Sequence, residues 1–251
     1  MNDQSSPQEV LQRIPGWERA SWRELDGGLT NRNWLVEVSG RKAVLKVDAS
    51  PRTLPFNNRR DEARIQRAAA TLGLANSVLF ATDTIYLTEY VDGKVWSGEQ
   101  LQSDDNIGAL ASALRALHAL PLTGRVFDPL TAAKRYLLEI GDADPLIAKR
   151  CMDTVQSMQK PQHLCCCHND LVAENILMAE TLRFLDWEYA ADNDPFFDLA
   201  TIVAHHRLSN RQADLLLDAY FDGGGTRWYK RLAEQEQLYE ALYWLWSQSR
   251  P

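Results

Sequence analysis

The sequence lacks a long uninterrupted apolar run and a basic cluster. None of its 251 residues belongs to a stretch approaching the ~20 consecutive apolar residues that a membrane span requires. The polar segment 1–10 has no apolar core of the secretory-signal type. Lys and Arg total 27 against 34 Asp and Glu, which gives a net charge of −7. These features argue against binding to nucleic acids and against membrane insertion, so we expect a cytoplasmic protein with a small-molecule or cationic partner.

Cysteine is scarce and is not arranged as a disulfide framework. The four cysteines are Cys151 and the consecutive run Cys165, Cys166 and Cys167. Adjacent cysteines do not easily satisfy the geometry of a bridge with each other, and the C-x₂-C spacing of a zinc site is absent. We therefore expect small buried apolar side chains in a reducing compartment.

What the sequence does contain is enough apolar residues, 45%, for a sizeable core. The first ninety residues predict antiparallel strands within 22–38, 41–47 and 79–90, with one helix over 61–74. The remainder predicts mostly helices, at 103–119, 130–140, 145–158, 196–206, 211–221 and 228–247, with short strands at 164–167, 176–178 and 182–185. We expect an α+β fold with a β-rich lobe, residues 1–90, and a larger helical lobe, residues 91–251. The turn-prone segment 91–93 would be the hinge.

The segment HNDLVAEN, residues 168–175, carries the strongest chemical signal. An Asn follows Asp170 by five residues, and Asp186 follows Asn175 by eleven, at the end of an apolar strand. This spacing resembles the catalytic loop and metal-binding aspartate of the kinase fold. Mg²⁺ prefers oxygen ligands such as the Asn175 amide and the Asp186 carboxylate. A carboxylate such as Asp170 can orient an acceptor hydroxyl and take its proton.

Other candidates lie upstream, in the β-rich region. Lys46 interrupts the apolar strand 43–47, and Glu62 lies on the next predicted helix. We expect Lys46 to bind the α/β-phosphates of a nucleotide and Glu62 to hold it by an ion pair. A two-glycine turn precedes them and is predicted to cover the phosphates; its residues are Gly27, Gly28, Thr30 and Asn31.

Two paired motifs receive structural interpretations. Arg59 and Arg60 are predicted to be a solvated helix start. His205 and His206 are adjacent, so their side chains point about 100° apart on a helix and do not chelate one ion well. We expect one of these histidines to be packed and the other exposed.

Eight segments match one family of small-molecule kinases, in the same order and over nearly the whole chain. They are GGLTNRNW (27–34), KAVLK ending at Lys46, the helix with Glu62, LTEYVDG (87–93), LRALH (114–118), HNDLVAEN (168–175), LDWEYAADNDPFFDLA (185–200) and LYWLWS (242–247). The chain resembles the choline/ethanolamine kinase family, within the aminoglycoside-phosphotransferase-like kinases. The resemblance implies a two-lobed protein-kinase-like fold, with ATP and Mg²⁺ as cofactors, in a monomer or homodimer.

The resemblance also implies a role for each matching residue. Asp170 would be the catalytic base, His168 would brace its loop, and Asp198 would hold the loop backbone. Asn175 and Asp186 would bind Mg²⁺. Glu89 and Val91 would meet adenine through their main chain.

The same resemblance implies a substrate pocket, formed by Glu188, Tyr189, Tyr243 and Trp246. Tyr243 and Trp246 are three residues apart and share a helical face. A quaternary ammonium has no N–H to donate and can be held by aromatic faces and a carboxylate. Trp244, on the same helix, is predicted to be a core residue. Choline is therefore the expected acceptor, with ethanolamine also considered.

Four alternatives are weighed against choline kinase. Thiamine is also a cationic primary alcohol, and an aminoglycoside kinase would prefer a broad acidic cleft. An inactive kinase-fold binding protein is disfavoured because Lys46, Asp170, Asn175 and Asp186 are all retained. A protein kinase is disfavoured because only the segment 187–197 separates Asp186 from Asp198, which leaves no room for a long activation segment.

Overall fold

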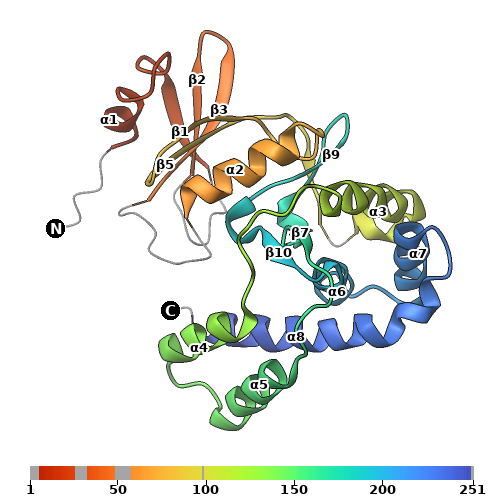
Figure 1. Cartoon of the computed structure of the whole chain (residues 1–251). Helices are drawn as coiled ribbons and strands as arrows, with labels where there is room; N and C mark the ends of the chain where they lie inside the picture. Colours follow the sequence, from red (N-terminus) through yellow and green to blue (C-terminus); the bar gives the residue numbers. More distant parts are fainter. Residues whose placement is uncertain (1–5, 26–32, 49–57, 98, 250–251) are drawn as a thin grey trace. The chain divides into compact units, whose positions relative to one another are not determined.

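The computed structural model describes residues 6–25, 33–48, 58–97 and 99–249 (Figure 1). Its contacts divide the chain into two compact units. The first comprises Met1–Lys94 and Leu177–Tyr189, and the second comprises Val95–Ile176 and Ala190–Pro251.

The first unit is built on a five-stranded antiparallel sheet. Its strands are β1 (Ser21–Leu25), β2 (Asn33–Val38), β3 (Arg41–Val47), β4 (Val78–Ala81) and β5 (Ile85–Glu89), in the order β1-β2-β3-β5-β4. Ser39 and Gly40 join β2 to β3, and both have positive φ, 51° and 76°. A two-residue turn with two positive φ angles matches the twist of paired strands, which explains the glycine. The predicted hairpins are confirmed.

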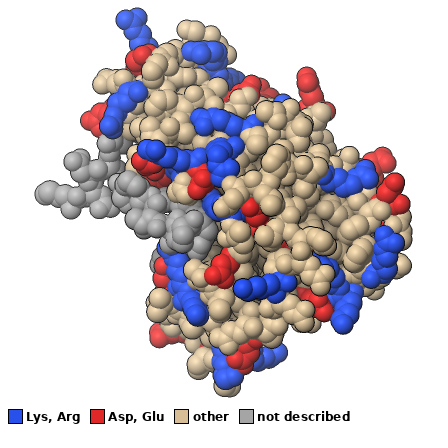
Figure 2. Space-filling model, viewed as in Figure 1, with Lys and Arg blue, Asp and Glu red and all other residues tan. Residues whose placement is uncertain are grey.

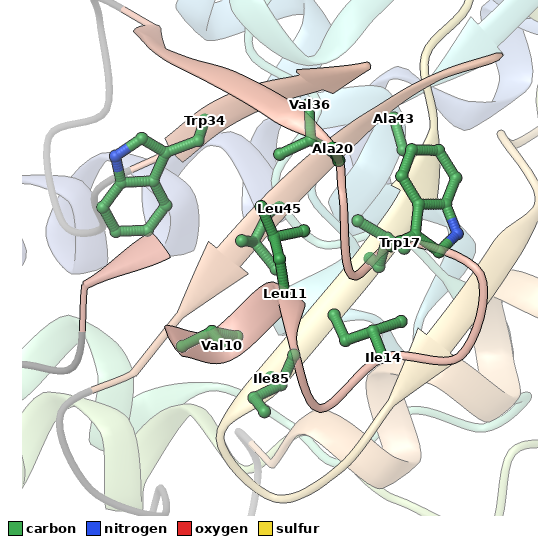
Figure 3. Close-up of a cluster of buried hydrophobic side chains, with 11 residues drawn as sticks. Val10, Leu11, Ile14, Trp17, Ala20, Trp34, Val36, Ala43, Leu45 and Ile85 are labelled. Atoms are coloured by element: carbon green, nitrogen blue, oxygen red, sulfur yellow. The ribbon is translucent and has the colours of Figure 1, made fainter. Parts of the chain in front are cut away.

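A short helix that the sequence prediction missed, α1 (Pro7–Leu11), covers part of this sheet. Ser6 accepts a hydrogen bond from the Glu9 amide, and the Glu9 carboxylate accepts one from the Ser6 amide, which forms a capping box. Figure 3 shows the side chains of Leu11 and Ile14 among those of the sheet strands. The apolar core of this unit consists of Val10, Leu11, Ile14, Trp17, Ala20, Trp34, Val36, Ala43, Leu45, Ile85 and Leu87.

Helix α2 (Arg59–Ala70) packs in the same unit and positions the charged residues described below. Asn58 caps it by accepting a hydrogen bond from the Asp61 amide, so it begins two residues earlier than predicted. The buried Gln66 amide ties the helix to its neighbours: it donates to the Asn76 carbonyl at 2.7 Å and accepts from the Tyr86 hydroxyl at 2.7 Å. This fixes the rotation of α2 against β5.

A small sheet has the order β6 (Lys94–Val95), β8 (Ile176–Met178), β9 (Leu182–Phe184). The β8–β9 hairpin was predicted, and the 3₁₀ turn η3 (Trp187–Tyr189) follows it.

The second unit is mainly helical. It contains η1 (Gln100–Gln102), α3 (Asp104–His118), α4 (Pro129–Glu139), α5 (Pro145–Ser157), η2 (Ala173–Asn175), α6 (Pro195–His205), α7 (Asn210–Phe221), η4 (Gly225–Trp228) and α8 (Tyr229–Gln248). One antiparallel pair of strands, β7 (Cys165–Cys167) and β10 (Ala191–Asn193), lies among them. The six predicted helices of this region are confirmed.

Three of these helices start with the same dipeptide, Asp-Pro. Asp128, Asp144 and Asp194 each accept hydrogen bonds from amides of the first turn, and each is followed by a proline at the first helical position. The carboxylate satisfies amides that have no partner within the helix, and proline already has a helical φ. These three helix starts are therefore fixed locally by the sequence.

Helix α8 packs against α4, α5 and α6 (Figure 1). The core it shares with them consists of Ala132, Ala133, Met152, Val155, Phe197, Leu238, Tyr239, Ala241, Leu242 and Leu245. Trp244 packs against this core, as predicted. Basic and acidic side chains are interspersed on the face shown in Figure 2. Among the described residues, no helix is both long and apolar enough to span a membrane.

Candidate active site

In the first unit, Lys46 on β3 forms an ion pair with Asp186. The Nζ–Oδ1 distance is 2.9 Å, and the Lys46 side chain is only 13% exposed. Burial alone would lower the pKa of Lys46, but the carboxylates of Asp186, Glu62 and Glu188 raise it above its ordinary value. The neighbouring carboxylates therefore keep Lys46 positively charged despite its burial.

The segment that carries Asp186 is anchored by the residue after it. Trp187 is fully buried, and its indole N–H donates to the Phe184 carbonyl at 3.0 Å. Asp186 itself has a left-handed backbone, φ 58°. Such a conformation is uncommon for a residue other than glycine and needs support from its surroundings. The buried indole supplies that support.

The expected direct ion pair between Glu62 and Lys46 is wrong for this structure. Glu62 pairs instead with Arg59, at 2.8 Å, and Arg59 also makes a two-point ion pair with Asp48, at 2.6 and 3.0 Å. Arg59 is fully buried, so the prediction of a solvated helix start is wrong for it. Its guanidinium also lies 5.3 Å from the centre of the Tyr86 ring. The planar guanidinium holds Asp48 by two hydrogen bonds while it donates a third to Glu62, and a lysine lacks this two-point geometry.

Glu62 nevertheless belongs to the same charge cluster as Lys46. It is fully buried, and burial raises its pKa despite the opposing effects of Arg59 and Lys46. Glu188 is buried in this unit and contributes to the electrostatic environment of both Lys46 and Glu62. Tyr189, next to it, is half-buried.

The segment predicted to contact adenine begins at Glu89, the last residue of β5. The Glu89 amide donates to the Ser77 carbonyl at 2.8 Å, and its carbonyl accepts from the Asn76 side chain at 3.2 Å. Val91 is half-buried and lies outside any strand. The four residues predicted to cover the phosphates, Gly27, Gly28, Thr30 and Asn31, lie outside the described residues.

In the second unit, a buried carboxylate clamps the HNDLVAEN loop. Asp198 on α6 is fully buried and accepts hydrogen bonds from the backbone amides of His168, at 2.8 Å, and Asn169, at 2.7 Å. His118 Nε2 lies 3.1 Å from the same carboxylate, and His118 Nδ1 lies 2.7 Å from the Tyr220 hydroxyl. These bonds confirm the expectation that Asp198 holds the loop backbone.

The turn before Asp170 is held in an unusual backbone conformation. Asn169 has φ 65°, a region that Asn tolerates better than most residues. Its side-chain oxygen accepts from Asn193 at 2.8 Å, and its side-chain amide donates to the Ala191 carbonyl at 3.4 Å. Strand β10 therefore fixes the residue that presents Asp170.

Asp170 is oriented by Asn175. The Asn175 side-chain amide donates to both the Asp170 carbonyl and its Oδ2, each at 2.9 Å. The amide oxygen of Asn175 takes no part in these two bonds. His168, two residues before Asp170, is fully buried. The structure thus brings together three predicted residues: His168, Asp170 and Asn175.

A row of aromatic rings runs along α8 in the same unit. Tyr239 stacks on Tyr243 with centroids 5.8 Å apart, and Tyr243 stacks on Trp246 at 5.6 Å. His205 lies against the row, with Nδ1 3.2 Å from the Tyr239 hydroxyl. Burial raises the pKa of Tyr239, and the Asp170 carboxylate adds to the rise. The row therefore lies within electrostatic reach of the catalytic loop.

The histidine pair differs from expectation in one respect. His206 is buried and its Nε2 lies 3.2 Å from the Leu171 carbonyl, whereas His205 is half-buried rather than exposed. Burial lowers the pKa of both. The neutral His205 ring can therefore pack against the aromatic row.

Several side chains that contact the predicted site residues were not themselves predicted as site residues: Asp48, Arg59, His118, Asn193, Tyr220 and Tyr239. Two carried a usable signal. Asp48 follows the last residue of β3, Val47, and lies two residues after Lys46, so the two side chains are close along the chain. Tyr239 lies four residues before Tyr243 on a helix, which makes them neighbours.

Comparison with known proteins gives consistent matches. The model of the phosphotransferase enzyme family matches residues 21–234. Protein LicA of Haemophilus influenzae is 34% identical over 242 residues, 88% of this chain and 71% of that protein. A thiamine kinase of Salmonella typhi is 28% identical over 197 residues, 77% of this chain and 68% of that protein. The crystal structure of choline kinase LicA from Streptococcus pneumoniae has a TM-score of 0.80 and 24% identity, and covers 96% of this chain and 89% of that one.

The fold is therefore the expected two-lobed α+β fold of the kinase type. The chain belongs to the phosphotransferase enzyme family, among its choline/ethanolamine kinase-like members, as the sequence motifs indicated.

Replacing Arg59 by Met should strongly destabilise the protein. The change leaves the buried carboxylates of Asp48 and Glu62 without their cation, which typically costs about 3–5 kcal/mol. Unfolding in urea, followed by tryptophan fluorescence, measures the loss. Arg60→Met is the matched control, because the Arg60 ion pair with Asp83 is exposed and should contribute little. Equal midpoints for the two variants would contradict the assignment.

Proposed function

We propose that this phosphotransferase transfers the γ-phosphate of ATP to the hydroxyl of a small cationic alcohol in the cytoplasm, and that choline is its acceptor. The observation that carries the proposal is the proximity, within the second unit, of an oriented carboxylate and a row of stacked aromatic rings. Asp170 is held by Asn175, and its charge acts on Tyr239, the first ring of the row. A quaternary ammonium is held by such faces because its charge has no N–H to donate.

In this proposal Asp170 orients the acceptor hydroxyl and takes its proton as the phosphoryl group is transferred. The two hydrogen bonds from Asn175 keep the carboxylate in one orientation. His168 and Asp198 act through the loop backbone rather than on the substrate. Glu188 and Tyr189 remain proposed substrate contacts, with Glu188 offering the counter-charge.

On the nucleotide side, Lys46 is proposed to bind the α/β-phosphates, and its raised pKa keeps it charged. Glu62 supports that charge at a distance while bonded to Arg59. The main chain of Glu89 and Val91, and the turn of Gly27, Gly28, Thr30 and Asn31, complete the proposed ATP contacts. These last residues follow from the family resemblance alone.

The donor set fits a magnesium ion. The carboxylate of Asp186 and the amide oxygen of Asn175 are hard oxygen donors of the kind that Mg²⁺ prefers. A magnesium ion held by these two residues, as the family resemblance implies, would neutralise charge on the phosphate oxygens of the nucleotide. Asn175 would then have two roles, since its amide nitrogen holds Asp170.

Thiamine is the second candidate acceptor. The Salmonella typhi thiamine kinase matches 77% of this chain. Thiamine is also a cationic primary alcohol, and its flat rings would stack on the exposed face of Tyr243.

The test is consumption of ATP by the purified protein with Mg²⁺, against choline, ethanolamine, thiamine and an aminoglycoside. We expect the highest kcat/KM with choline. A higher kcat/KM with thiamine would support the proposed phosphoryl transfer but would make thiamine, and not choline, the acceptor. No turnover with any of the four, despite measurable ATP binding, would contradict the kinase proposal and favour a binding protein.

Asp170→Asn should lower kcat by about 10²–10⁴-fold and leave ATP affinity nearly unchanged, because the amide cannot accept the proton. Steady-state kinetics and a nucleotide-binding titration measure the two effects. Glu180→Gln, an exposed carboxylate in the β8–β9 turn, is the control and should behave as wild type. The expected loss of kcat is at least about 10²-fold. A loss of less than about threefold for Asp170→Asn would therefore contradict the role of Asp170 as the catalytic base.

Trp246→Ala should raise the KM for choline by about 2–30-fold, the equivalent of the 0.5–2 kcal/mol of one cation–π contact, with little change in kcat. Trp246→Phe should restore most of the affinity. The neutral isostere 3,3-dimethyl-1-butanol is the matched substrate control. If its KM rises as much as that of choline, the aromatic face contributes packing and not attraction of the cation.

A further inference from the structure

The second unit contains a group of metal-binding side chains that the proposed function does not use. Cys165 and Cys167 lie on β7, and His118 is the last residue of α3. Their ligand atoms all lie within 4.8 Å of one another, and the two sulfur atoms are 3.5 Å apart. Residues i and i+2 of a strand share a face, whereas Cys166 between them points to the other side. The strand therefore presents two thiols to one histidine.

The spacing suits a tetrahedral ion. With metal–sulfur bonds of about 2.3 Å, two cysteine ligands of one zinc ion lie about 3.7 Å apart. The observed 3.5 Å needs no movement of the strand. Bringing the imidazole to the same ion requires a shift of about 1 Å, because a zinc-bound nitrogen lies about 3.5 Å from a zinc-bound sulfur. Rotation of side chains supplies such a shift.

The surroundings of His118 match those of a metal-bound histidine. Its Nε2 lies 3.1 Å from the Asp198 carboxylate, which can only accept, so Nε2 carries the proton. Its Nδ1 keeps the lone pair and accepts from the Tyr220 hydroxyl at 2.7 Å. A carboxylate behind the imidazole is the usual arrangement at zinc sites, because it fixes the tautomer and strengthens the ligand. An ion would take the place of the hydroxyl proton at Nδ1.

The chemistry of the ligands selects the class of ion. Two thiols and an imidazole favour zinc and other thiophilic ions over magnesium and calcium. Burial raises the pKa of the Cys167 thiol, which donates weakly to the carbonyls of Asn193 and Asp194 at 3.6 Å. A bound cation would compensate the negative charge of a buried thiolate and so favour the deprotonated form that binds metal.

We propose that Cys165, Cys167 and His118 form a binding site for a thiophilic divalent ion of the zinc class, with one position open to water. The site is separate from the magnesium ligands assigned above. It is linked to the catalytic loop through Asp198, which hydrogen-bonds both His118 and the loop amides. An ion at this site would therefore brace the loop, and only this consequence for activity rests on the proposed kinase function.

The test uses Cd²⁺ and Zn²⁺ with the reduced, full-length protein. Cd²⁺ should produce a thiolate charge-transfer absorption at one equivalent, and Zn²⁺ should displace it. Zn²⁺ should also raise the thermal unfolding midpoint, because it binds the folded state. Neither measurement depends on turnover, so failure of the kinase proposal would leave both intact.

Cys165→Ser and Cys167→Ser should each weaken binding more than tenfold, since even loss of an outer partner of a ligand typically costs about 10–100-fold. Cys166→Ser, on the opposite face of the same strand, and Cys151→Ser, on α5, are the matched controls and should bind as wild type. Equal affinity in all four variants, or no thiolate absorption in wild type, would overturn the proposal.

Tyr220→Phe provides a test that loss of structure would not mimic. It removes the hydroxyl that competes for Nδ1 but keeps the ring that packs edge-on against His118. Zinc affinity should therefore rise, by about 2–10-fold for the loss of one competing hydrogen bond. Weaker binding in this variant would show that Nδ1 is not a ligand.

Discussion

The buried carboxylate of Asp198 is the interaction on which the catalytic loop depends. A fully buried charge is costly unless hydrogen bonds compensate it. Here the compensation comes from the loop amides of His168 and Asn169 and from His118. Moving the loop away would leave the buried carboxylate without these hydrogen bonds, which is energetically costly, so the loop stays in place. Asn169 can therefore keep its left-handed backbone, and Asp170 is presented in a single orientation. The bond from Tyr220 to His118 extends the same chain to α7.

The first unit uses charge in a different way. Among the residues that the structure describes, the carboxylates of Asp48, Glu62, Asp186 and Glu188 lie around the cations of Lys46 and Arg59. Arg59 satisfies two of the carboxylates permanently, because its fork reaches both. Lys46 has one ion-pair partner at bonding distance, Asp186, and is more exposed than Arg59. Arg59 is therefore committed to holding the structure together, whereas Lys46 is the cation that we propose for the phosphates.

Most helices and strands could be predicted from local sequence. Several helices start at Asp-Pro caps, and strands such as β2 and β3 end at turn residues. Helix α1 was not predicted because it is short, although Ser6 and Glu9 are the residue types of a capping box. Motif spacing likewise led to Asp170, Asn175 and Asp186, whose catalytic and metal-binding roles stay predictions. Pairing between distant residues was harder. Glu62 lies three residues after Arg59 on α2, so helical spacing alone brings the two side chains together. Nothing near Arg59 indicates that Asp48 is also within its reach, because the tertiary fold decides which distant carboxylate an arginine meets.

The cysteines also show that a sequence pattern does not reveal which distant residues the fold brings together. The expected zinc spacing, C-x₂-C, arises where two ligands flank a tight turn, and its absence suggested inert side chains. A strand offers a second geometry, because alternate residues share a face and C-x-C then presents two sulfurs together. The third ligand, His118, comes from the end of a helix that is remote in sequence. A buried cysteine such as Cys167 can still be a metal ligand. Cys166, on the opposite face, behaves as the small buried side chain that was expected, while its two neighbours share one polar pocket with His118.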